Sequence, residues 1–485
     1  MQPQKTYSSW IMLFILIIFT CGSVSAQSDV WSTAYYAGWM QGQSNNGHLP
    51  AQDIDYSAVT HIVHFALMPN ANGTLDASAN SITQTNSAEL ISRAHANGVK
   101  VLISIGGWNS GDGFISASSP LNLTTFVANL VNFMTTRGYD GIDLDWEPLR
   151  SSDGALYIAL ATALRTAMDI AKPGALLTAA NGSEADIFAQ IHQHFDQINL
   201  MTYDMSGPWP GWVTWHNSPV YDGGFNFPST GKPVPSANAQ VDSFINAGIP
   251  AEKIGIGIDF YGYIWNGGNG TPTGGVTKPR QEWTSEPWMQ GNVPYYTIMQ
   301  DYYQPQYYGW DDAAKGAYLS IDNTGSSDDK FISYDDEQTV QAKFDYARSK
   351  GIGGLIVWEI GGGYRPDLPQ GQRDPLLQAV KTGLNGGTTG TDDIAKLPDQ
   401  FTLEQNYPNP FNPATTIQFS LPKTAYVELD IYNMLGEKVA VLVETTMSPG
   451  THNVVWNASN MASGVYIYQF RFDSIVQTKK MTLIK

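Results

Sequence analysis

The stretch Asp140-Gly141-Ile142-Asp143-Leu144-Asp145-Trp146-Glu147 decides the fold of this chain. Successive side chains of a β-strand point to opposite faces, so Asp143, Asp145 and Glu147 would share one face. Carboxyl groups crowded in this way cannot all ionise at neutral pH, so at least one pKa is raised and a general acid becomes available beside charged carboxylates. The alternative is an acidic turn or a calcium loop, but an EF-hand loop requires Gly at its sixth position and has no place for apolar Ile and Leu between its acids.

The residues around this strand predict a β/α barrel. The apolar residues between the acids would form the other face of the strand, and Phe126 to Gly138 has the pattern of an amphipathic helix that ends at glycine. A helix, a short loop and a strand with acids at its carboxyl end follow the order of a β/α barrel, whose chemistry lies at that end.

The octapeptide resembles the DxxDxDxE signature of glycoside hydrolase family 18, the chitinase family, with Asp140, Asp143, Asp145 and Glu147 at its defined positions. A barrel should supply about eight strand-like runs separated by helices, and parallel strands covered by helices are mostly continuous apolar runs. The chain contains such runs at Thr33-Gly38, Val59-Met68, Val99-Gly107, Tyr139-Glu147, Ala175-Asn181, Gln197-Tyr203, Ile254-Tyr261 and Gly353-Ile360. We therefore expect an α/β fold, a (β/α)8 TIM barrel over residues 27–384.

Three further motifs similar to those of the family follow in the expected order. Ser104-Ile105-Gly106-Gly107 ends the third run, Met201-Thr202-Tyr203-Asp204 ends the sixth, and Trp358 lies in the eighth. The resemblance implies that Glu147 protonates the glycosidic oxygen, while the substrate's own acetamido oxygen is the nucleophile.

The resemblance also assigns roles to the other site residues. Asp145 would orient and stabilise the N-acetyl group, Asp143 would share a proton or hydrogen bond with Asp145, and Tyr203 would donate to the acetamido carbonyl. Asp140 is out of phase with the other acids and is expected to be structural. The expected substrate-binding residues are Trp358, Asp204, Met201, Trp108, Tyr261 and Trp39.

The segment Ile256 to Tyr263 departs from the family pattern. Relatives commonly have Pro at the position of Asp259 and Arg at that of Tyr263. This difference concerns the local subsite and not the chemistry.

Aromatic residues are expected to line the substrate cleft, since sugar rings expose apolar faces. We expect at least two of five loop tryptophans to contact sugar: Trp39, Trp108, Trp209, Trp212 and Trp215. The stretch from Gly262 to about Val340 is too long for an ordinary loop and resembles a small α+β insertion that forms one wall of a deep groove. Candidates for that wall are Tyr263, Trp265, Trp283 and Trp288.

Both ends of the chain differ from the barrel. Residues 1–26 contain an apolar run and Val24-Ser25-Ala26, as in a signal peptide, and the run is short for a membrane span of about 20 residues. Residues 385–397 are a Gly/Thr-rich linker, and 398–485 alternate short strand-like runs with turns, as in a β-sandwich. The segment Tyr407 to Pro413 and the basic ending resemble the C-terminal sorting domain of the type IX secretion system of Bacteroidetes-like bacteria. A carbohydrate-binding or adhesive module is the alternative.

Composition limits the partners. The net charge of -18 disfavours binding to nucleic acid and to anionic membranes, whereas it does not affect binding to a neutral polysaccharide. The only cysteine, Cys21, lies in the expected signal peptide, so the mature chain would have no disulfide or thiol chemistry. The histidines are scattered, and we expect no metal, no cofactor and no membrane attachment after processing.

We therefore predict a secreted or cell-surface bacterial enzyme that acts as a monomer on chitin or chitooligosaccharides and is exported by the secretion machinery that reads its C-terminal domain. It would cut β-1,4 bonds between N-acetylglucosamine units and retain the anomeric configuration. The alternatives are an endo-β-N-acetylglucosaminidase, whose relatives generally lack the insertion, and a non-catalytic chitin-binding lectin, which usually lacks the last acid of the motif, whereas Glu147 is present.

Overall fold

The computed structural model describes residues 30–41, 48–269, 271, 274–323, 328–368, 373–386, 401–406, 408–421, 425–447, 450–472 and 475–484. The expected signal peptide and residues 387–397 of the expected linker lie outside the described residues.

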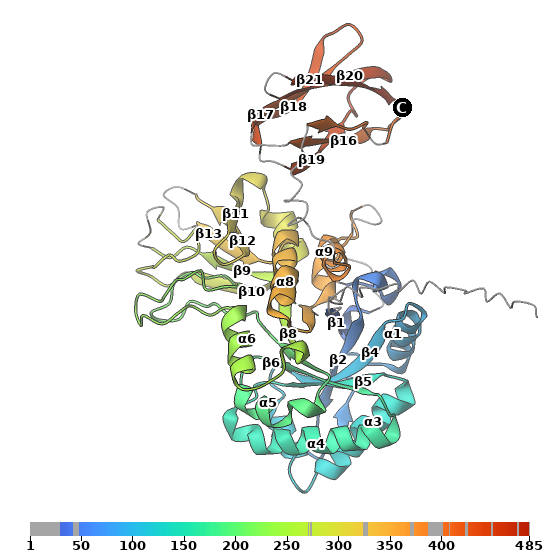
Figure 1. Ribbon diagram of the computed structural model, residues 1–485, viewed down its shortest axis with the longest axis vertical. Helices are drawn as coiled ribbons and strands as arrows, with labels where there is room; N and C mark the ends of the chain where they lie inside the picture. Colours follow the sequence, from blue (N-terminus) through green and yellow to red (C-terminus); the bar gives the residue numbers. More distant parts are fainter. Residues whose placement is uncertain are drawn as a thin grey trace, which may run out of the picture.

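Eight parallel strands close into a barrel in the order β1-β14-β8-β7-β6-β5-β4-β2, with β1 paired to β2 (Figure 1). Their bounds are β1 Trp31–Ala37, β2 His61–Pro69, β4 Lys100–Gly107, β5 Gly141–Trp146, β6 Leu176–Asn181, β7 Gln197–Leu200, β8 Ile254–Asp259 and β14 Gly354–Trp358. Each strand overlaps one of the runs predicted from sequence, so the predicted TIM barrel is confirmed. A short strand, β3 (Leu75–Asp76), pairs antiparallel with the end of β2.

Helices cover the outside of the barrel, as α3, α4 and α5 show in Figure 1. The principal helices are α1 Gln84–Ala96, α2 Gly111–Ala117, α3 Leu123–Arg137, α4 Gly154–Ala171, α5 Ala185–Ile191, α6 Ala237–Asn246, α8 Glu337–Lys350 and α9 Pro375–Leu384. Helix α3 ends at Gly138, which has a φ of 87° and lies in the left-handed region that glycine tolerates. The glycine stop predicted for this helix is thus present.

The alternation of β5 places its acids inside the barrel. Ile142, Leu144 and Trp146 belong to the core between the barrel and its helices, where Trp146 stacks on Phe114 at 4.7 Å between ring centroids. The acids between these residues point to the opposite face, since side chains alternate along a strand.

One helical segment in the described part of the chain, Ser151–Ala171, is long and apolar enough to cross a membrane by length and composition. It contains α4, whose residues Tyr157, Leu160, Leu164 and Met168 are buried in the barrel core. The apolar character of this helix is therefore explained by its packing in the barrel.

A five-stranded antiparallel sheet lies between β8 and α8 in sequence, with the order β10-β9-β13-β12-β11. Its elements are β9 Tyr261–Asn266, β10 Trp288–Pro294, α7 Tyr295–Thr297, β11 Tyr308–Asp311, β12 Gly316–Ile321 and β13 Lys330–Tyr334. This sheet, which we call the insertion sheet, occupies the segment where the sequence predicts an α+β insertion.

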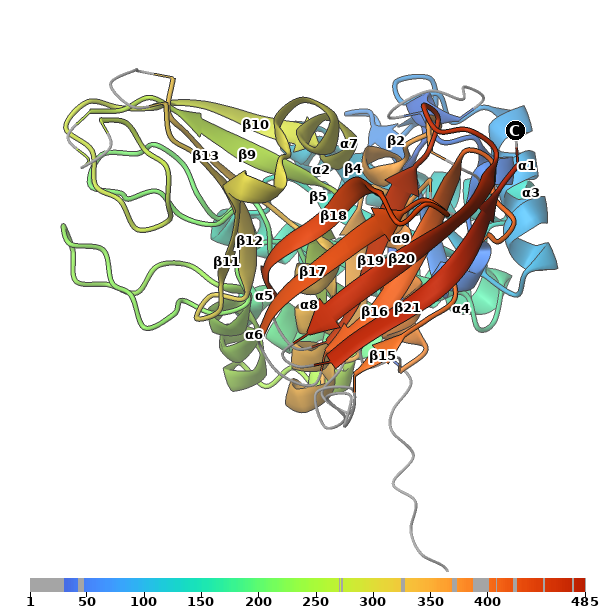
Figure 2. The same cartoon turned by 90° about the horizontal axis from the view of Figure 1, so that it is seen from above.

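The C-terminal segment is all-β and has its own core of buried residues such as Ile417, Leu429 and Phe470. Its two sheets have the orders β15-β16-β19 and β18-β17-β20-β21 (Figure 2). The strands are β15 Thr402–Leu403, β16 Ala414–Leu421, β17 Ala425–Tyr432, β18 Lys438–Met447, β19 Gly450–Asn457, β20 Gly464–Phe472 and β21 Ile475–Leu483.

Candidate active site

A cavity of about 1010 Å³ opens at the carboxyl ends of the barrel strands. Its lining includes Gly107 from β4, Asp145 from β5, Ala180 from β6 and Trp358 from β14. The insertion sheet adds Tyr263 on one side. A pocket of this size accommodates a ligand of several rings, and it lies where barrel enzymes place their chemistry.

Asp143 lies beneath this cavity, completely buried within the barrel. Its carboxylate accepts hydrogen bonds from Tyr35 Oη at 3.2 Å, Ser104 Oγ at 3.0 Å and Thr178 Oγ1 at 2.6 Å. Burial raises the pKa of Asp143 to about 6, against the lowering effect of these three donors. Asp143 can therefore hold or release a proton near neutral pH.

The buried Asp145 and the half-buried Glu147 form a pair above Asp143. Their carboxyl groups are hydrogen-bonded to each other, and burial together with the charges of Glu147 and Asp143 raises the pKa of Asp145 well above its usual range. Burial, followed by the charge of Asp204, raises the pKa of Glu147 to about 7. Asp145 Oδ1 has no hydrogen-bond partner among the described residues. The pair therefore offers a proton donor and an acceptor that has no protein partner of its own.

Tyr203 and Asp204 follow β7 and face this pair across the cavity. Asp204 Oδ1 accepts hydrogen bonds from Tyr261 Oη at 2.7 Å and Tyr263 Oη at 2.8 Å. Burial raises the pKa of Asp204 despite these two donors. No lysine, arginine or histidine belongs to the described lining of the cavity, so this carboxylate is held by neutral hydroxyl groups.

The glycines of Ser104-Ile105-Gly106-Gly107 let the end of β4 approach its neighbours closely. A Cβ atom on Gly106 would lie 2.0 Å from the carbonyl oxygen of Asp145, and one on Gly107 would lie 2.6 Å from the ring of Phe65. Both glycines have positive φ values, 115° and 103°. Side chains at these positions would displace the strand that carries the acids.

Aromatic rings form the floor and rim of the cavity. Trp358 lies on the floor and contacts Phe65 edge-on at 4.7 Å and Tyr35 at 5.7 Å between ring centroids. Trp39 and Trp108 lie on the rim, with 41% and 74% of their surfaces exposed. Exposed aromatic faces beside a row of carboxyl groups are suited to sugar rings.

The family model of "Glycosyl hydrolases family 18" matches residues 32–363, which include all eight barrel strands except the first residue of β1. The chain belongs to glycosyl hydrolase family 18. A second model, "Secretion system C-terminal sorting domain", matches residues 405–485. Both resemblances inferred from the sequence are thereby confirmed, and the chain is a glycoside hydrolase with a sorting domain for export.

Individual members of the family are similar over most of the catalytic part. "Chitinase A1" of Niallia circulans is 32% identical over 337 residues, which cover 60% of this chain and 46% of that protein. "Chitinase 1" of Aphanocladium album is 30% identical over 400 residues, which cover 76% of this chain and 88% of that protein. The crystal structure of Ostrinia furnacalis Group IV chitinase in complex with allosamidin is 25% identical, with a TM-score of 0.62 over 74% of this chain and all of that one.

The structure of this family 18 chain brings nine of the ten predicted site residues to one cavity. The nine that line it are Asp145, Glu147, Tyr203, Asp204, Met201, Trp39, Trp108, Tyr261 and Trp358. The tenth, Asp143, supports the pair from below through the barrel interior. Asp140 lies at the opposite end of β5, where it binds His95 Nε2 at 2.6 Å and the amide of Val101 at 2.9 Å.

Two of the five loop tryptophans do not line the cavity. Trp215 is fully buried and donates its indole N–H to the carbonyl oxygen of Pro235 at 2.9 Å. Trp212 packs between Trp209 and Phe227, at 4.5 and 4.6 Å between ring centroids, and only Trp209 of this loop's tryptophans lines the cavity.

The wall formed by the insertion sheet also differs from the expectation. Tyr263 lines the cavity, but Trp265 is fully buried against Trp283, and Trp288 is exposed outside the cavity lining. Tyr263 and Trp265 share one face of β9, so their different surroundings come from their positions along the strand and not from the alternation of its faces. The wall is completed by Met289, Asn292 and Pro294.

Several site residues were not singled out from the sequence. Tyr35 and Thr178 bind Asp143 from β1 and β6, and the only sequence signal for them is a polar group within an apolar run. Glu359 follows Trp358 in the cavity lining, and burial raises its pKa to about 8. Among the described residues, no group of three or more His, Cys, Asp or Glu has the arrangement of a metal site.

Proposed function

We propose that this chain is an exported chitinase that hydrolyses β-1,4 bonds between N-acetylglucosamine units by a retaining, substrate-assisted mechanism. The observation that carries the proposal is the hydrogen-bonded pair of Asp145 and Glu147, with raised pKa values, above the buried Asp143. The names of the relatives and the aromatic cavity support chitin as the substrate.

Glu147 is the proton donor in this proposal. Its raised pKa of about 7 leaves a large share of Glu147 protonated near neutral pH, and its position in the cavity lining lets it reach a glycosidic oxygen. Protonation of that oxygen lets the leaving sugar depart as an alcohol while positive charge develops on the anomeric carbon. The ionised form of Glu147 then activates water for the second step.

Asp145 acts on the acetamido group of the sugar that is cleaved. The acetamido oxygen attacks the anomeric carbon from the face opposite the leaving group, and the resulting oxazolinium ion carries positive charge near its nitrogen. A carboxylate at Asp145 accepts the N–H and stabilises that charge, because both lie in a site of low dielectric constant. Asp143 accommodates the proton that Asp145 gives up, since its own pKa is about 6.

Tyr203 holds the other end of the acetamido group by donating to its carbonyl oxygen. Trp358 packs under the same sugar, and Trp39 and Trp108 carry neighbouring sugars along the rim. Met201 and Tyr261 complete the wall around the N-acetyl group and its neighbour. Water attacks the intermediate from the side that the leaving group occupied, so two inversions give net retention.

Product analysis tests the proposal. Mass analysis should show chitin hexamer cut into shorter oligomers, with a high-mannose glycopeptide left intact in a parallel reaction. NMR of the first-formed product should show the β anomer at the new reducing end. Cleavage of the glycopeptide alone would indicate an endo-β-N-acetylglucosaminidase, and an α anomer would exclude the substrate-assisted mechanism.

A further inference from the structure

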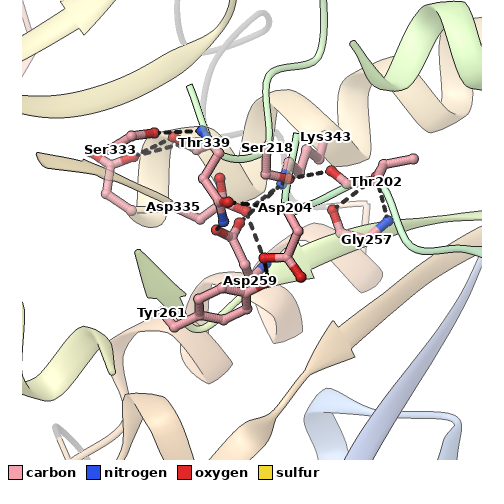
Figure 3. A network of polar contacts seen from close by, with 12 residues as sticks. Thr202, Asp204, Ser218, Gly257, Asp259, Tyr261, Ser333, Asp335, Thr339 and Lys343 are labelled. Carbon is pink, nitrogen blue, oxygen red and sulfur yellow. Dashed lines mark hydrogen bonds and ion pairs between the residues drawn. The ribbon is translucent and has the colours of Figure 1, made fainter. Parts of the chain in front are cut away.

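A buried ionic cluster lies beside Asp204, which lines the cavity (Figure 3). Its cation is Lys343 of α8, whose side chain is completely buried. The Lys343 ammonium forms an ion pair with Asp335, which follows β13, and lies 3.6 Å from Asp259 Oδ1 at the end of β8. It also donates to Ser218 Oγ at 2.6 Å. The cluster therefore joins the barrel, the insertion sheet and α8.

The charges of this cluster depend on one another. Burial, followed by the charge of Asp259, raises the pKa of Asp335 well above its usual range, and the Lys343 ammonium opposes that rise. Removing one partner from a buried ion pair leaves an uncompensated charge, which is strongly unfavourable. Asp259 is one of the residues at which we expect the sequence to depart from the family pattern.

One hydrogen-bonded path leads from the cluster to Asp204. Asn217 donates its side-chain N–H to Asp259, and its side-chain oxygen accepts the backbone N–H of Asp204 at 3.1 Å. Its carbonyl oxygen accepts the backbone N–H of Met205 at 3.0 Å. Asp204 has a φ of 58°, in the region that non-glycine residues rarely adopt. Asn217 thus accepts the backbone N–H groups before and after the Asp204 Cα atom, and these two bonds hold the unfavourable backbone conformation of Asp204.

A second path leads to Tyr203. Ser218, which accepts from Lys343, donates to the carbonyl oxygen of Thr202 at 2.6 Å. The Thr202 hydroxyl in turn accepts the backbone N–H of Gly257 at 2.7 Å. The residues on both sides of Tyr203 are therefore anchored to the same cluster, although no member of the cluster lines the cavity.

We propose that Lys343 is a positioning residue for the active site, which holds Tyr203 and Asp204 in place through Ser218 on one path and through Asp259 and Asn217 on the other. The inference rests on the proposed function, because Tyr203 and Asp204 act on the substrate only there. The two paths explain why a lysine is buried at this place, where its desolvation would otherwise be costly.

The charged and titratable groups around the cluster define the expected pH dependence. Asp259 and Asp335 face Lys343, and the charge of Asp259 also acts on Asp204 and on the hydroxyl of Tyr203. Tyr261 and Tyr263 face the charges of Asp204 and Asp259 from β9. Without the Lys343 ammonium, Asp259 and Asp335 would lie together with no cation between them, and a proton on Asp335 would reduce the negative charge that remains.

The test is Lys343→Met in the full chain, with kcat and KM for chitin hexamer measured from pH 5 to 8. We expect kcat at pH 7.5 to fall at least tenfold, with a smaller change in KM because Trp39, Trp108 and Trp358 still bind the sugars. The ratio of the variant's kcat to that of the wild type should rise as the pH falls, because a proton on Asp335 reduces the negative charge that the lost ammonium leaves unbalanced. A purely structural role would lower the yield of folded protein without changing this ratio.

Asn217→Ala tests the hydrogen-bonded path from Asp259 to Asp204 without changing the charge of Lys343. This variant keeps the ion pair but loses the side-chain bonds to Asp259 and Asp204, so kcat should fall without recovery at low pH. It also decides the question if Lys343→Met does not fold. Lys172→Met is the matched control, since it removes a lysine that lies 3.6 Å from Asp140 at the other end of β5, and its kcat should equal that of the wild type.

The experiments distinguish a failure of the positioning role of Lys343 from a failure of the proposed chitinase function. Wild-type kcat and an unchanged pH profile in folded Lys343→Met or folded Asn217→Ala would overturn the positioning role. Absence of turnover by the wild-type enzyme on chitin hexamer, in the same assay, would instead contradict the proposed function. If the wild type cleaves only the glycopeptide, the same variants measured on that substrate still decide the role of Lys343.

Discussion

The carboxyl groups of Asp145 and Glu147 are hydrogen-bonded to each other, so one of the two must carry a proton. Both have raised pKa values because both are buried, and each feels at least one further acid: Asp143 acts on Asp145, and Asp204 acts on Glu147. The pair therefore couples the group that would donate a proton to the group that would receive the acetamido N–H.

Glu147→Gln should abolish most of the turnover while leaving binding intact. Glutamine has the shape of a protonated glutamic acid and still forms a hydrogen bond to Asp145, but it has no acidic proton to give. Loss of a general acid typically costs about 10²- to 10⁴-fold in rate. Turnover of chitin hexamer measures the loss, and calorimetric titration with the same oligomer measures binding. Wild-type turnover by this variant would contradict the assignment of the proton donor.

Asp145→Asn should also slow the reaction severely, by about 10²-fold or more on the scale of a lost electrostatic contact in a transition state. A neutral amide cannot stabilise the positive charge of the oxazolinium ion.

Fully deacetylated oligomers should not be cleaved by the wild-type enzyme, since they lack the nucleophile. Hydrolysis of a deacetylated oligomer at the rate of chitin hexamer would show that the acetamido group takes no part.

The alkaline limb of the pH profile should depend on Asp204. Glu147 donates a proton only below its pKa of about 7, so kcat/KM should fall as the pH rises through that value. The negative charge of Asp204 is one cause of that raised pKa. Asp204→Asn removes the charge, so the pKa of Glu147 should fall and the alkaline limb should move to lower pH. Asp186→Asn, which makes the same charge change at an exposed position on α5, should leave the limb where it is.

The barrel and most residues of its cavity could be predicted from the sequence, because the patterns that indicate them lie within short segments of the chain. A period of two along β5 places Asp143 and Asp145 on one face, whatever surrounds the strand. The ends of the strands were equally predictable, since residues such as Tyr203 and Trp358 follow or end apolar runs. In a barrel these positions meet at one end, which brings residues far apart in sequence to one cavity.

The contacts between strands could not be predicted in the same way. Tyr35 and Thr178 reach Asp143 only because β1 and β6 curve round the same barrel interior. Trp215 is buried in a cluster that joins its own long loop to Ala314, 99 residues further along the chain, and no local pattern distinguishes it from the exposed Trp209. Asp259 was evident as a departure from the family, but its partner Lys343 lies 84 residues further along the chain. These contacts depend on tertiary packing, which a single sequence does not reveal.

The stability of the catalytic part should fall as the pH rises from about 4 to 8. Burial raises the pKa of Asp374 and of Glu359 to about 8, whereas unfolded carboxyl groups ionise near pH 4. Between these values the folded state holds protons that the unfolded state releases. Each such group therefore lowers the free energy of unfolding by about 1.4 kcal/mol per pH unit over this window, and its contribution is fully present only below pH 4.

Asp374→Asn isolates one of these two groups. Asparagine can still accept the backbone N–H of Leu377, a bond of 3.1 Å that caps α9, but it does not titrate. The variant should be more stable than the wild type at pH 8 in urea unfolding, and the difference should shrink as the pH falls to about 4.5. Asp186→Asn serves again as the control for a lost surface charge. An identical pH dependence in wild type and Asp374→Asn would contradict the assignment.

A protein that ends at Leu384 should hydrolyse soluble chitin oligomers at close to the full-length rate. The buried residues of the catalytic core run from Val30 to Val380, and those of the sorting domain begin at Phe401, so the two cores are separate. All ten predicted site residues precede Leu384, which is the last residue of α9. The turnover of chitin hexamer by the two purified proteins is the measurement, with circular dichroism to confirm that the shorter one is folded. In a host with the matching secretion system, the full chain should reach the cell surface or medium, and the shorter one should remain inside the cell envelope. Loss of soluble-substrate turnover in a folded, shortened protein would mean that the sorting domain contributes to catalysis.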